Sequence, residues 1–244
     1  MQVRPYSALA RVYDDIMDYV DHEAWADYID HLLDEHDAEP ANVVEFGCGT
    51  GQFAHHFLAR RRVAFTATDG SPDMLSHAAD RLDGRASTLA VTYPGAAAPG
   101  GPYDLAILLY DGLNYLLTED DIKGLLAQAA ASLGPGGLFV FDQSTPANSI
   151  NNAEFFEDED DLEDGSYVRK STYDEETRMH TTRFELTLED GVFEEEHVER
   201  AWTMQEIQDL LTDGGWRVLA AYDGFSFDPA DDDAERIHWV AVHD

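Results

Sequence analysis

Three glycines spaced two residues apart, Gly47, Gly49 and Gly51, follow a short apolar run in this chain. Residues 42–53 therefore predict a strand, a tight turn and the start of a helix. Because glycine has no Cβ, the turn can take positive φ and let a ligand lie against bare backbone, near the N–H groups of the following helix. Glu45 places a negative charge at the end of the strand, which suits a ligand with an ammonium group better than one with a pyrophosphate. We expect a small-molecule site here.

Strand-like and helix-like segments alternate from this glycine stretch to Asp142. After the first strand, further strands are predicted at residues 64–68, 88–92, 105–110 and 138–141. The alternation predicts an α/β fold with a parallel sheet and helices on both faces, in which ligands bind at the carboxyl ends of the strands. Asp69 lies at such an end, where an acid can bind both hydroxyls of a ribose.

The segments on either side of this core have other patterns. Two amphipathic helices are predicted at residues 6–19 and 22–33, where they could form a lid over the ligand. The acidic residues 146–165 predict a solvated linker. Period-two alternation then predicts an antiparallel insertion, with strands at residues 167–173, 179–188 and 192–202 and a turn at Asp190-Gly191. A helix from Thr203 and two strands, at residues 216–222 and 237–242, complete the fold.

These patterns contain no internal repeat and no domain break. We expect one domain over residues 1–244. Its parts are N-terminal helices (1–40), a ligand-binding core (41–145), the acidic linker with the antiparallel insertion (146–202), and a last helix with two core strands (203–244).

The chain is strongly acidic, with 50 Asp and Glu against 15 Lys and Arg and a formal net charge of −35. This composition is typical of proteins from salt-accumulating halophiles, in which concentrated salt screens the self-repulsion. The sequence has no stripe of basic residues that could neutralise nucleic-acid phosphates, so nucleic acid is not expected as a partner. No apolar run is long enough to span a membrane, and Cys48 is the single cysteine. We expect a cytoplasmic protein.

No metal site is predicted. The histidines lack the spacing of metal ligands, and the acidic linker lacks the pattern of an EF-hand calcium loop.

Four segments together resemble the class I S-adenosylmethionine-dependent methyltransferases, and the resemblance covers nearly the whole chain. The segments are Glu45-Phe-Gly47-Cys-Gly49-Thr-Gly51, Asp69 to Leu75, Tyr103 to Leu109 and Leu133 to Asp142. Residues 6–14 and 110–116 resemble the small-molecule branch of that superfamily. The resemblance implies a seven-stranded, mostly parallel Rossmann-like sheet with an N-terminal helical lid and an antiparallel insertion after the fifth strand. It also implies S-adenosylmethionine as the cofactor.

The resemblance assigns cofactor-binding roles to particular positions. Glu45 would face the ammonium group, Asp69 would bind the ribose hydroxyls, and Met74 would border the adenine. Tyr110 and Asp111, after the fourth strand, would lie near the transferring methyl, and Tyr13 would close over it. The full set implied for the cofactor is Tyr13, Glu45, Gly47, Cys48, Gly49, Gly51, Asp69, Gly70, Met74, Tyr110 and Asp111.

One position departs from the family pattern. Many members carry an acid after the third strand that accepts from the adenine amino group, whereas this chain has Val91-Thr92-Tyr93-Pro94. Thr92, a backbone carbonyl or a stacking Tyr93 could replace it.

Several other residues have simpler explanations. Tyr13, Trp25 and Tyr28 could be core residues, and Asn114 and Tyr115 could brace the turn after the fourth strand. The pair His55-His56 is expected at the surface or in packing. No catalytic residue is identified, and His197 on the insertion is the remaining candidate for a general base.

The predicted function is methyl transfer to an N, O or C atom of an unidentified small molecule. The first alternative, an NAD-dependent dehydrogenase, conflicts with Gln52, where the dinucleotide fingerprint has glycine. The second is a cofactor-binding or oligomerisation protein without catalysis, in which the insertion strands, polar on both faces, could form a homodimer surface.

Overall fold

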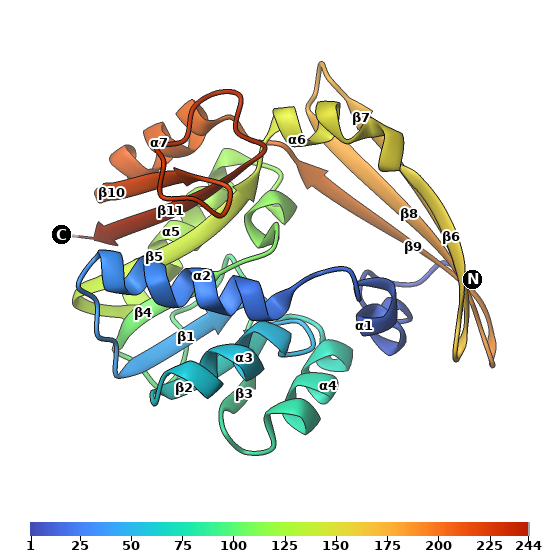
Figure 1. Ribbon diagram of the computed structural model, residues 1–244, viewed down its shortest axis with the longest axis horizontal. Helices are drawn as coiled ribbons and strands as arrows, with labels where there is room; N and C mark the ends of the chain where they lie inside the picture. The colour runs from blue at the N-terminus through green and yellow to red at the C-terminus, as the bar shows by residue number, and fades with distance from the viewer. Residues whose placement is uncertain (244) are drawn as a thin grey trace.

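Seven strands form the central sheet of the computed structural model, which describes residues 1–243 (Figure 1). Their order is β10-β11-β5-β4-β1-β2-β3. The strands are β1 (Asn42–Phe46), β2 (Ala64–Asp69), β3 (Ser87–Ala90), β4 (Tyr103–Leu108), β5 (Leu133–Ser144), β10 (Trp216–Asp223) and β11 (Arg236–His243). Only β11 runs against its neighbours among these strands. The predicted mostly parallel, Rossmann-like α/β sheet is confirmed.

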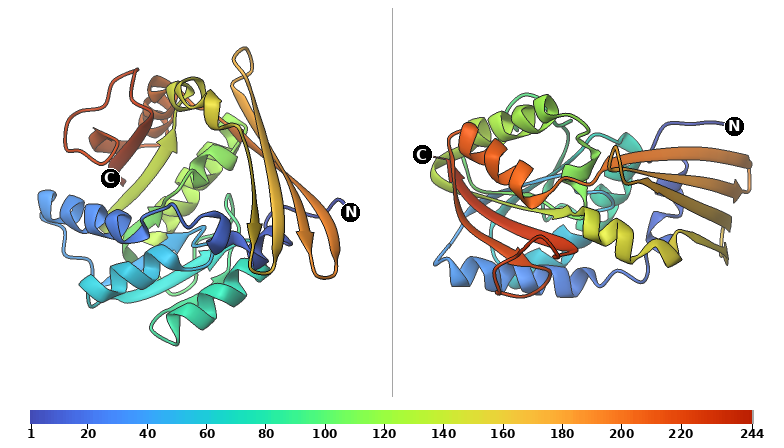
Figure 2. Two further views of the ribbon diagram at one scale, coloured as in Figure 1. Left: turned by 45° about the vertical axis from the view of Figure 1, so that its right-hand side comes forward. Right: turned by 90° about the horizontal axis from the view of Figure 1, so that it is seen from above.

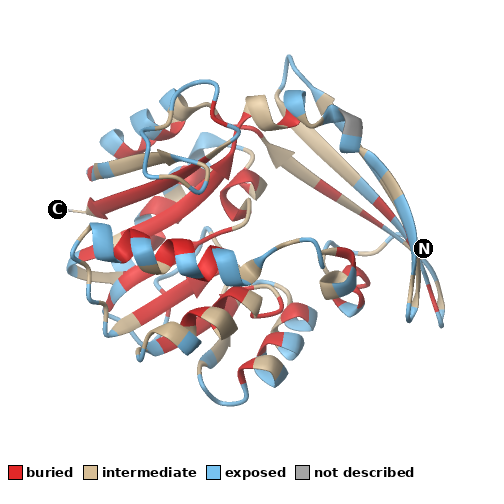
Figure 3. Cartoon of the chain, in the orientation of Figure 1, coloured by how far each residue is buried: buried red, intermediate tan, exposed pale blue. Residues whose placement is uncertain are grey.

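Helices cover both faces of this sheet (Figure 2). α2 (His22–Glu35), α3 (Gln52–Arg60) and α4 (Pro72–Leu82) pack on one face, and α5 (Glu119–Ser132) and α7 (Met204–Asp213) on the other. Successive strand residues point to opposite faces. Val44 and Phe46 of β1 accordingly contact the α5/α7 side, while Val43 contacts the α2/α3 side. The central strands are therefore buried on both faces (Figure 3).

Local sequence signals fix where the helices begin. The Ser71 side chain caps α4 by accepting from the Met74 backbone N–H, with Pro72 in the first helical position. Thr118 with Asp121 and Thr203 with Glu206 form capping boxes at α5 and α7. Each box satisfies two backbone donors that would otherwise have no partner at the helix end.

Four strands form a second, antiparallel sheet in the order β6-β7-β8-β9. They are β6 (Glu157–Leu162), β7 (Gly165–Asp174), β8 (Met179–Leu188) and β9 (Gly191–Arg200). The predicted insertion is confirmed, but the solvated linker predicted at residues 146–165 is wrong. That segment forms α6 (Pro146–Asn151), the 3₁₀ turn η3 (Ala153–Phe155) and β6. Main-chain pairing with β7 orders the acidic run, and Asp158 pairs with Arg169 at 2.6 Å. Exposed charges are tolerated there because β6 is an edge strand.

The N-terminal segment is less helical than its periodicity predicts. Residues 6–19 contain only the 3₁₀ turn η1 (Leu9–Arg11) and the short helix α1 (Tyr13–Ile16). The apolar face is buried as predicted, but against Tyr167, Phe184, Leu186 and Leu188 of the second sheet. The backbone N–H groups of Tyr6 and Ala8 donate to the Glu195 carboxylate of β9. Because Glu195 lies far along the chain, local periodicity could not predict this contact. The contact determines where the 3₁₀ turn η1 begins.

The first residues also join the second sheet. Val3 N donates to Glu194 O at 3.0 Å, and Glu194 N donates to Met1 O at 2.9 Å. The chain start is thereby tied beside β9. One strand begins earlier than predicted, because β5 starts at Leu133 and the glycine-rich residues 134–137 form its irregular first part. No helix within residues 1–243 has the length and apolar character needed to cross a bilayer.

Candidate active site

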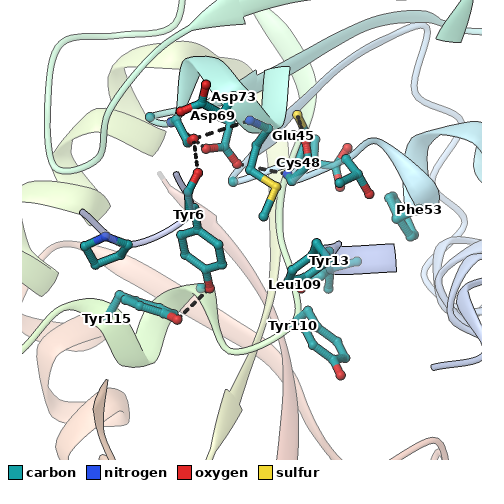
Figure 4. Close-up of a pocket in the computed structure, with 18 of the residues that line it drawn as sticks. Tyr6, Tyr13, Glu45, Cys48, Phe53, Asp69, Asp73, Leu109, Tyr110 and Tyr115 are labelled. Atoms are coloured by element: carbon teal, nitrogen blue, oxygen red, sulfur yellow. Dashed lines mark hydrogen bonds between the residues drawn. The ribbon is translucent and has the colours of Figure 1, made fainter. Parts of the chain in front are cut away.

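A cavity of about 430 Å³ opens at the carboxyl ends of β1, β2 and β4; we call it the glycine-loop cavity. Most of the residues predicted to bind a cofactor line it. They are Tyr13, Glu45, Gly47, Cys48, Gly49, Asp69, Gly70, Met74 and Tyr110. Figure 4 shows Glu45, Cys48 and Asp69 close together, with the tyrosines farther along the wall. The cavity therefore lies where the strand–turn–helix pattern predicts it.

The glycine turn has the positive φ angles predicted for it, and its glycines differ in what they contact. Gly49 has a φ of +54°, and a Cβ placed on it would meet no atom within 4 Å. Its backbone is therefore open to a ligand. Gly51 has a φ of +78°, and its Cβ would lie 3.2 Å from the Ala78 Cα on α4. Gly51 thus permits close packing of two helices and lies behind the cavity wall.

Asp69 holds the loop together. Its Oδ2 accepts from Gly49 N at 2.9 Å, and its Oδ1 accepts from Ser71 N at 2.8 Å. Burial raises the pKa of this carboxyl, while those two N–H groups act in the opposite direction. Each carboxylate oxygen can accept a second hydrogen bond. Asp69 therefore joins the ends of β1 and β2 and can still receive donors from the cavity.

Glu45 is a buried acid with an unsatisfied oxygen. The residue is 3% exposed, and its Oε2 has no hydrogen-bond partner among residues 1–243. Burial, with a smaller contribution from Asp69, raises the pKa of Glu45 to about 8. A buried carboxylate without a partner is costly. A cationic group in the cavity would supply the missing partner.

The region after β3 lines the cavity without an acid. Thr92 and Tyr93 both line it. The Thr92 carbonyl already accepts from Gln128 Nε2 at 3.1 Å, and Tyr93 Oη donates to Gly112 O at 3.3 Å. Asp73, in the first turn of α4, also lines the cavity, although it was not among the residues predicted to bind the cofactor.

A second cavity of about 560 Å³ lies beside the first, between the central sheet and the second sheet; we call it the inter-sheet cavity. Four tyrosines line both cavities: Tyr6, Tyr13, Tyr110 and Tyr115. Polar groups from distant segments line the inter-sheet cavity, including Asn148, His180, His197, Glu199 and Arg236. The two spaces therefore share a wall of aromatic rings.

Asp111, predicted beside the cofactor, lies in the inter-sheet cavity instead. Its carboxylate accepts from Arg236 of β11, which also contacts Asp142. Asn114 braces the same turn, because its side chain bonds the backbone of Ser144 and of Arg200. Of the two explanations left open for Asn114, the structure supports bracing.

Of the other residues for which a core or surface position was considered, Trp25 lines a cavity, whereas Tyr28 and His55 do not. Trp25 lines the glycine-loop cavity and packs against Tyr110, with ring centroids 5.6 Å apart. Tyr28 packs in the core, and its hydroxyl donates to Ser226 O at 2.8 Å. His55 lies beside Arg85, away from both cavities.

The N-terminal segment closes the site by direct contacts that local sequence did not reveal. Thr50 Oγ1, in the glycine turn, donates to Asp14 Oδ1 at 2.7 Å, and Arg81 contacts the same carboxylate. Ser71 Oγ donates to Tyr6 O at 2.8 Å. Residues 6–14 are therefore fastened to the loop that they cover. No group of His, Cys, Asp and Glu within residues 1–243 is arranged to hold a metal ion.

Comparison with known proteins agrees with this arrangement. Residues 17–221 match a family model described as a methyltransferase domain. A Bacillus subtilis (strain 168) protein, YqeM, provisionally named a methyltransferase, is 26% identical over 97% of this chain and 96% of its own length.

Solved structures share the fold. An S-adenosylmethionine-dependent methyltransferase from Clostridium acetobutylicum superposes with a TM-score of 0.81, at 22% identity over 98% of each chain. CalS10, an amino pentose methyltransferase from Micromonospora echinaspora solved with S-adenosylmethionine bound, superposes with a TM-score of 0.70, at 22% identity over 94% of this chain and 95% of its own. The chain therefore belongs to the methyltransferase-domain family and has the fold of the class I S-adenosylmethionine-dependent methyltransferases.

Proposed function

We propose that this protein transfers a methyl group from S-adenosylmethionine, held in the glycine-loop cavity, to a small molecule held in the inter-sheet cavity. The observation that carries the proposal is the shared wall: Tyr6, Tyr13, Tyr110 and Tyr115 line both spaces. A donor and an acceptor bound on the two sides would meet there. Alignment of the two is the main requirement, because the cofactor supplies a methyl group already activated by its sulfonium.

The residues present fit such a cofactor. Glu45 offers a buried oxygen without a partner, which an α-ammonium group would satisfy. Asp69 keeps acceptor positions for a pair of vicinal hydroxyls, and Gly49 leaves the backbone open. Tyr93 and Thr92 line the same cavity, and we assign them to the border of the cofactor's adenine. The assignment of individual roles to these residues is part of the proposal.

The acceptor side supports a small molecule. The inter-sheet cavity, of about 560 Å³, has the size of known small-ligand pockets. It is lined by polar groups and by aromatic rings, including Phe156 and Phe184. The relative CalS10 acts on an amino pentose, a molecule of that size class.

Titration calorimetry in high-salt buffer tests the cofactor half of the proposal. We expect the folded protein to bind S-adenosylhomocysteine, and the Asp69→Ala variant to bind it roughly 10- to 100-fold more weakly, because hydrogen bonds to a charged group are lost. Asp80 is an exposed acid on α4, the helix that Ser71 caps. Asp80→Asn is therefore the matched control and should bind normally. Absence of binding by the folded wild-type protein would overturn the proposal.

A second assay tests transfer itself. Release of S-adenosylhomocysteine is followed over a panel of small amines, phenols and hydroxy acids. Turnover of any member supports an enzyme. Cofactor binding without turnover across a broad panel would favour the alternative of a binding module without catalysis.

A further inference from the structure

A line of hydrogen bonds runs from the shared tyrosine wall into the second sheet. Tyr6 Oη and Tyr115 Oη are 2.5 Å apart, as the dashed line in Figure 4 marks. Tyr115 Oη lies 2.9 Å from His197 Nδ1, and His197 Nε2 lies 3.3 Å from Glu195 Oε2. The line therefore begins at both cavities and ends on a buried His–Glu pair.

Glu195 anchors this line as a carboxylate. It is 1% exposed, and burial alone would raise its pKa. The bond to His197 and the backbone N–H groups of Tyr6, Ala8 and Leu9 reverse that effect and lower the pKa below its usual value. The distances from these three backbone nitrogens to the Glu195 carboxylate oxygens are 2.6 to 2.9 Å. Glu195 thus remains ionised inside the fold.

The ionised Glu195 fixes the direction of the bond from His197 and allows the other bonds in the line to follow the same direction. A carboxylate can only accept, so His197 must carry its proton on Nε2 and donate it to Glu195. In a neutral ring the Nδ1 atom is then an acceptor, and Tyr115 can donate to it. The Tyr115 oxygen can in turn accept from Tyr6. A lone pair of Tyr6 remains for a donor in the cavity.

We propose that His197 is the terminal base of a proton relay in which Tyr6 and Tyr115 carry the proton away from the methyl acceptor and Glu195 positions the imidazole. This inference rests on the proposed function. It makes Tyr6 the group that touches the acceptor, and it makes Tyr115, His197 and Glu195 residues that act through it.

The step balances without any other reactant. The acceptor atom forms a bond to the methyl carbon while the carbon–sulfur bond breaks, and that electron pair stays on sulfur. The acceptor's proton passes to Tyr6 Oη, the Tyr6 proton to Tyr115, and the Tyr115 proton to His197 Nδ1. The resulting imidazolium is paired with Glu195. Only an acceptor with an N–H or O–H group can use this path.

The surroundings of His197 favour it over other groups as the end of the line. Burial raises the pKa of Tyr6 and of Tyr115 well above the usual value, so both remain neutral and can pass a proton without keeping it. From β8, Phe184 packs on the His197 ring and brings no charge.

Glu199 is the other candidate to receive the proton. It follows Glu195 and His197 on the same face of β9, and its carboxyl is hydrogen-bonded to Tyr115. Burial and the neighbouring Asp111 raise its pKa to about 8, so at neutral pH it already holds a proton. His197 therefore remains the open acceptor.

Nitrogen NMR on protein labelled with [¹⁵N]histidine tests the geometry before any acceptor is known. His197→Gln identifies the His197 signals by their loss. We expect the neutral ring with its proton on Nε2, and we expect Tyr115→Phe to shift the Nδ1 resonance toward that of a free acceptor nitrogen. A proton on Nδ1, or no response to Tyr115→Phe, would overturn the relay.

Kinetics test the chemical role, using S-adenosylhomocysteine release with the amine and phenol panel. We expect His197→Gln to lower kcat by roughly 100-fold or more and to remove the acid limb of the pH profile, while KM for the cofactor changes little. His31→Gln is the control, since His31 is exposed on α2 and lines neither cavity. Glu199→Gln should also keep the acid limb.

The outcomes separate this inference from the proposed function. Cofactor binding and thermal melting of each variant show whether it is folded and loaded. A wild-type pH profile in a folded His197→Gln variant would overturn the relay and leave methyl transfer standing. Loss of the limb in Glu199→Gln alone would also overturn it, because the proton would then end on Glu199.

Discussion

Arg236 of β11 makes a bidentate ion pair with Asp111, which lies 125 residues earlier in the turn after β4. Nη1 is 2.8 Å from Oδ1, and Nη2 is 3.2 Å from Oδ2. Asp111 and the preceding Tyr110 both have positive φ, at 63° and 61°. Non-glycine residues hold that conformation only where their surroundings enforce it. The pair therefore holds the turn that places Tyr110 in the shared wall.

Removing this cation should be strongly destabilising. Arg236 also contacts Asp142, which is fully buried and has one oxygen without a partner among residues 1–243. Arg236→Met leaves two acids unpaired, so we expect a loss of roughly 3–5 kcal/mol of unfolding free energy near neutral pH, measured by urea denaturation. Arg183→Met breaks an exposed pair with Glu196 and should cost less than about 1 kcal/mol. Equal losses in the two variants would contradict this account.

Cofactor affinity should depend on pH through Glu45. Its pKa of about 8 means that the empty site is protonated at neutral pH, whereas an ammonium ligand needs the carboxylate. We expect calorimetric affinity for S-adenosylhomocysteine to rise toward about pH 8, by up to roughly tenfold per pH unit, and to fall again as the ligand's own amine deprotonates. Glu45→Gln should bind weakly and without the rising limb. A flat wild-type profile would show that Glu45 does not pair with the ligand.

Glu45 should also make the empty protein less stable as pH rises, whereas cofactor affinity increases over the same range. The folded-state pKa of Glu45 is raised above the ordinary value of 4.5. Its contribution to stability is therefore complete below that value and is lost as pH rises through about 8. Glu45→Gln should remove this part of the pH dependence of melting.

Two glycine substitutions should separate packing from binding. Gly51→Ala places a Cβ 3.2 Å from the Ala78 backbone at positive φ, so we expect a loss of roughly 2 kcal/mol or more of unfolding free energy. Gly49→Ala carries only the strain of its φ, about 1 kcal/mol, because its Cβ meets open space. That Cβ would occupy the ligand's approach, so binding should weaken more in Gly49→Ala. Urea denaturation and calorimetry on both variants would reveal the reverse order if the assignment is wrong.

Acid should destabilise the protein through His238. The side chain is fully buried, its Nδ1 bonds Gly224 O at 2.7 Å, and burial together with Arg236 lowers its pKa to about 3. The unfolded chain takes up this proton near pH 6.5 and the folded protein does not. Stability should therefore fall as pH drops below that value, by up to about 1.4 kcal/mol per pH unit.

His238→Phe should make that decline shallower, as measured by urea denaturation across the acid range. His77→Gln, at an exposed position on α4, is the control and should keep the wild-type slope. An unchanged slope in His238→Phe would assign the acid sensitivity to other groups.

Features set by near neighbours in sequence could be predicted. The glycine turn, the Ser71 cap and both capping boxes depend on residues within a few positions of one another. The alternation of strands with helices predicted the parallel sheet for the same reason, since each strand's pattern of burial is local. The glycine-loop cavity followed, because parallel strands bring Glu45 and Asp69 to one edge.

Features that depend on contacts between distant parts of the chain could not be predicted from the sequence. The acidic run at residues 157–162 became β6 only because β7 pairs with it, and the N-terminal helix shortened because Glu195 satisfies the N–H groups of Tyr6 and Ala8. Asp111 likewise pairs with Arg236, which lies 125 positions away in the sequence, and so lines the inter-sheet cavity.

The sequence by itself thus determined the cofactor-side loop, where short-range backbone geometry decides the outcome. The wall of tyrosines and the line from Tyr6 through Tyr115 to His197 were decided by tertiary structure alone. Tyr6 and Tyr115 lie 109 positions apart along the chain, and Tyr115 and His197 lie 82 apart. No local propensity specifies which side chains the packing of two sheets will bring into contact.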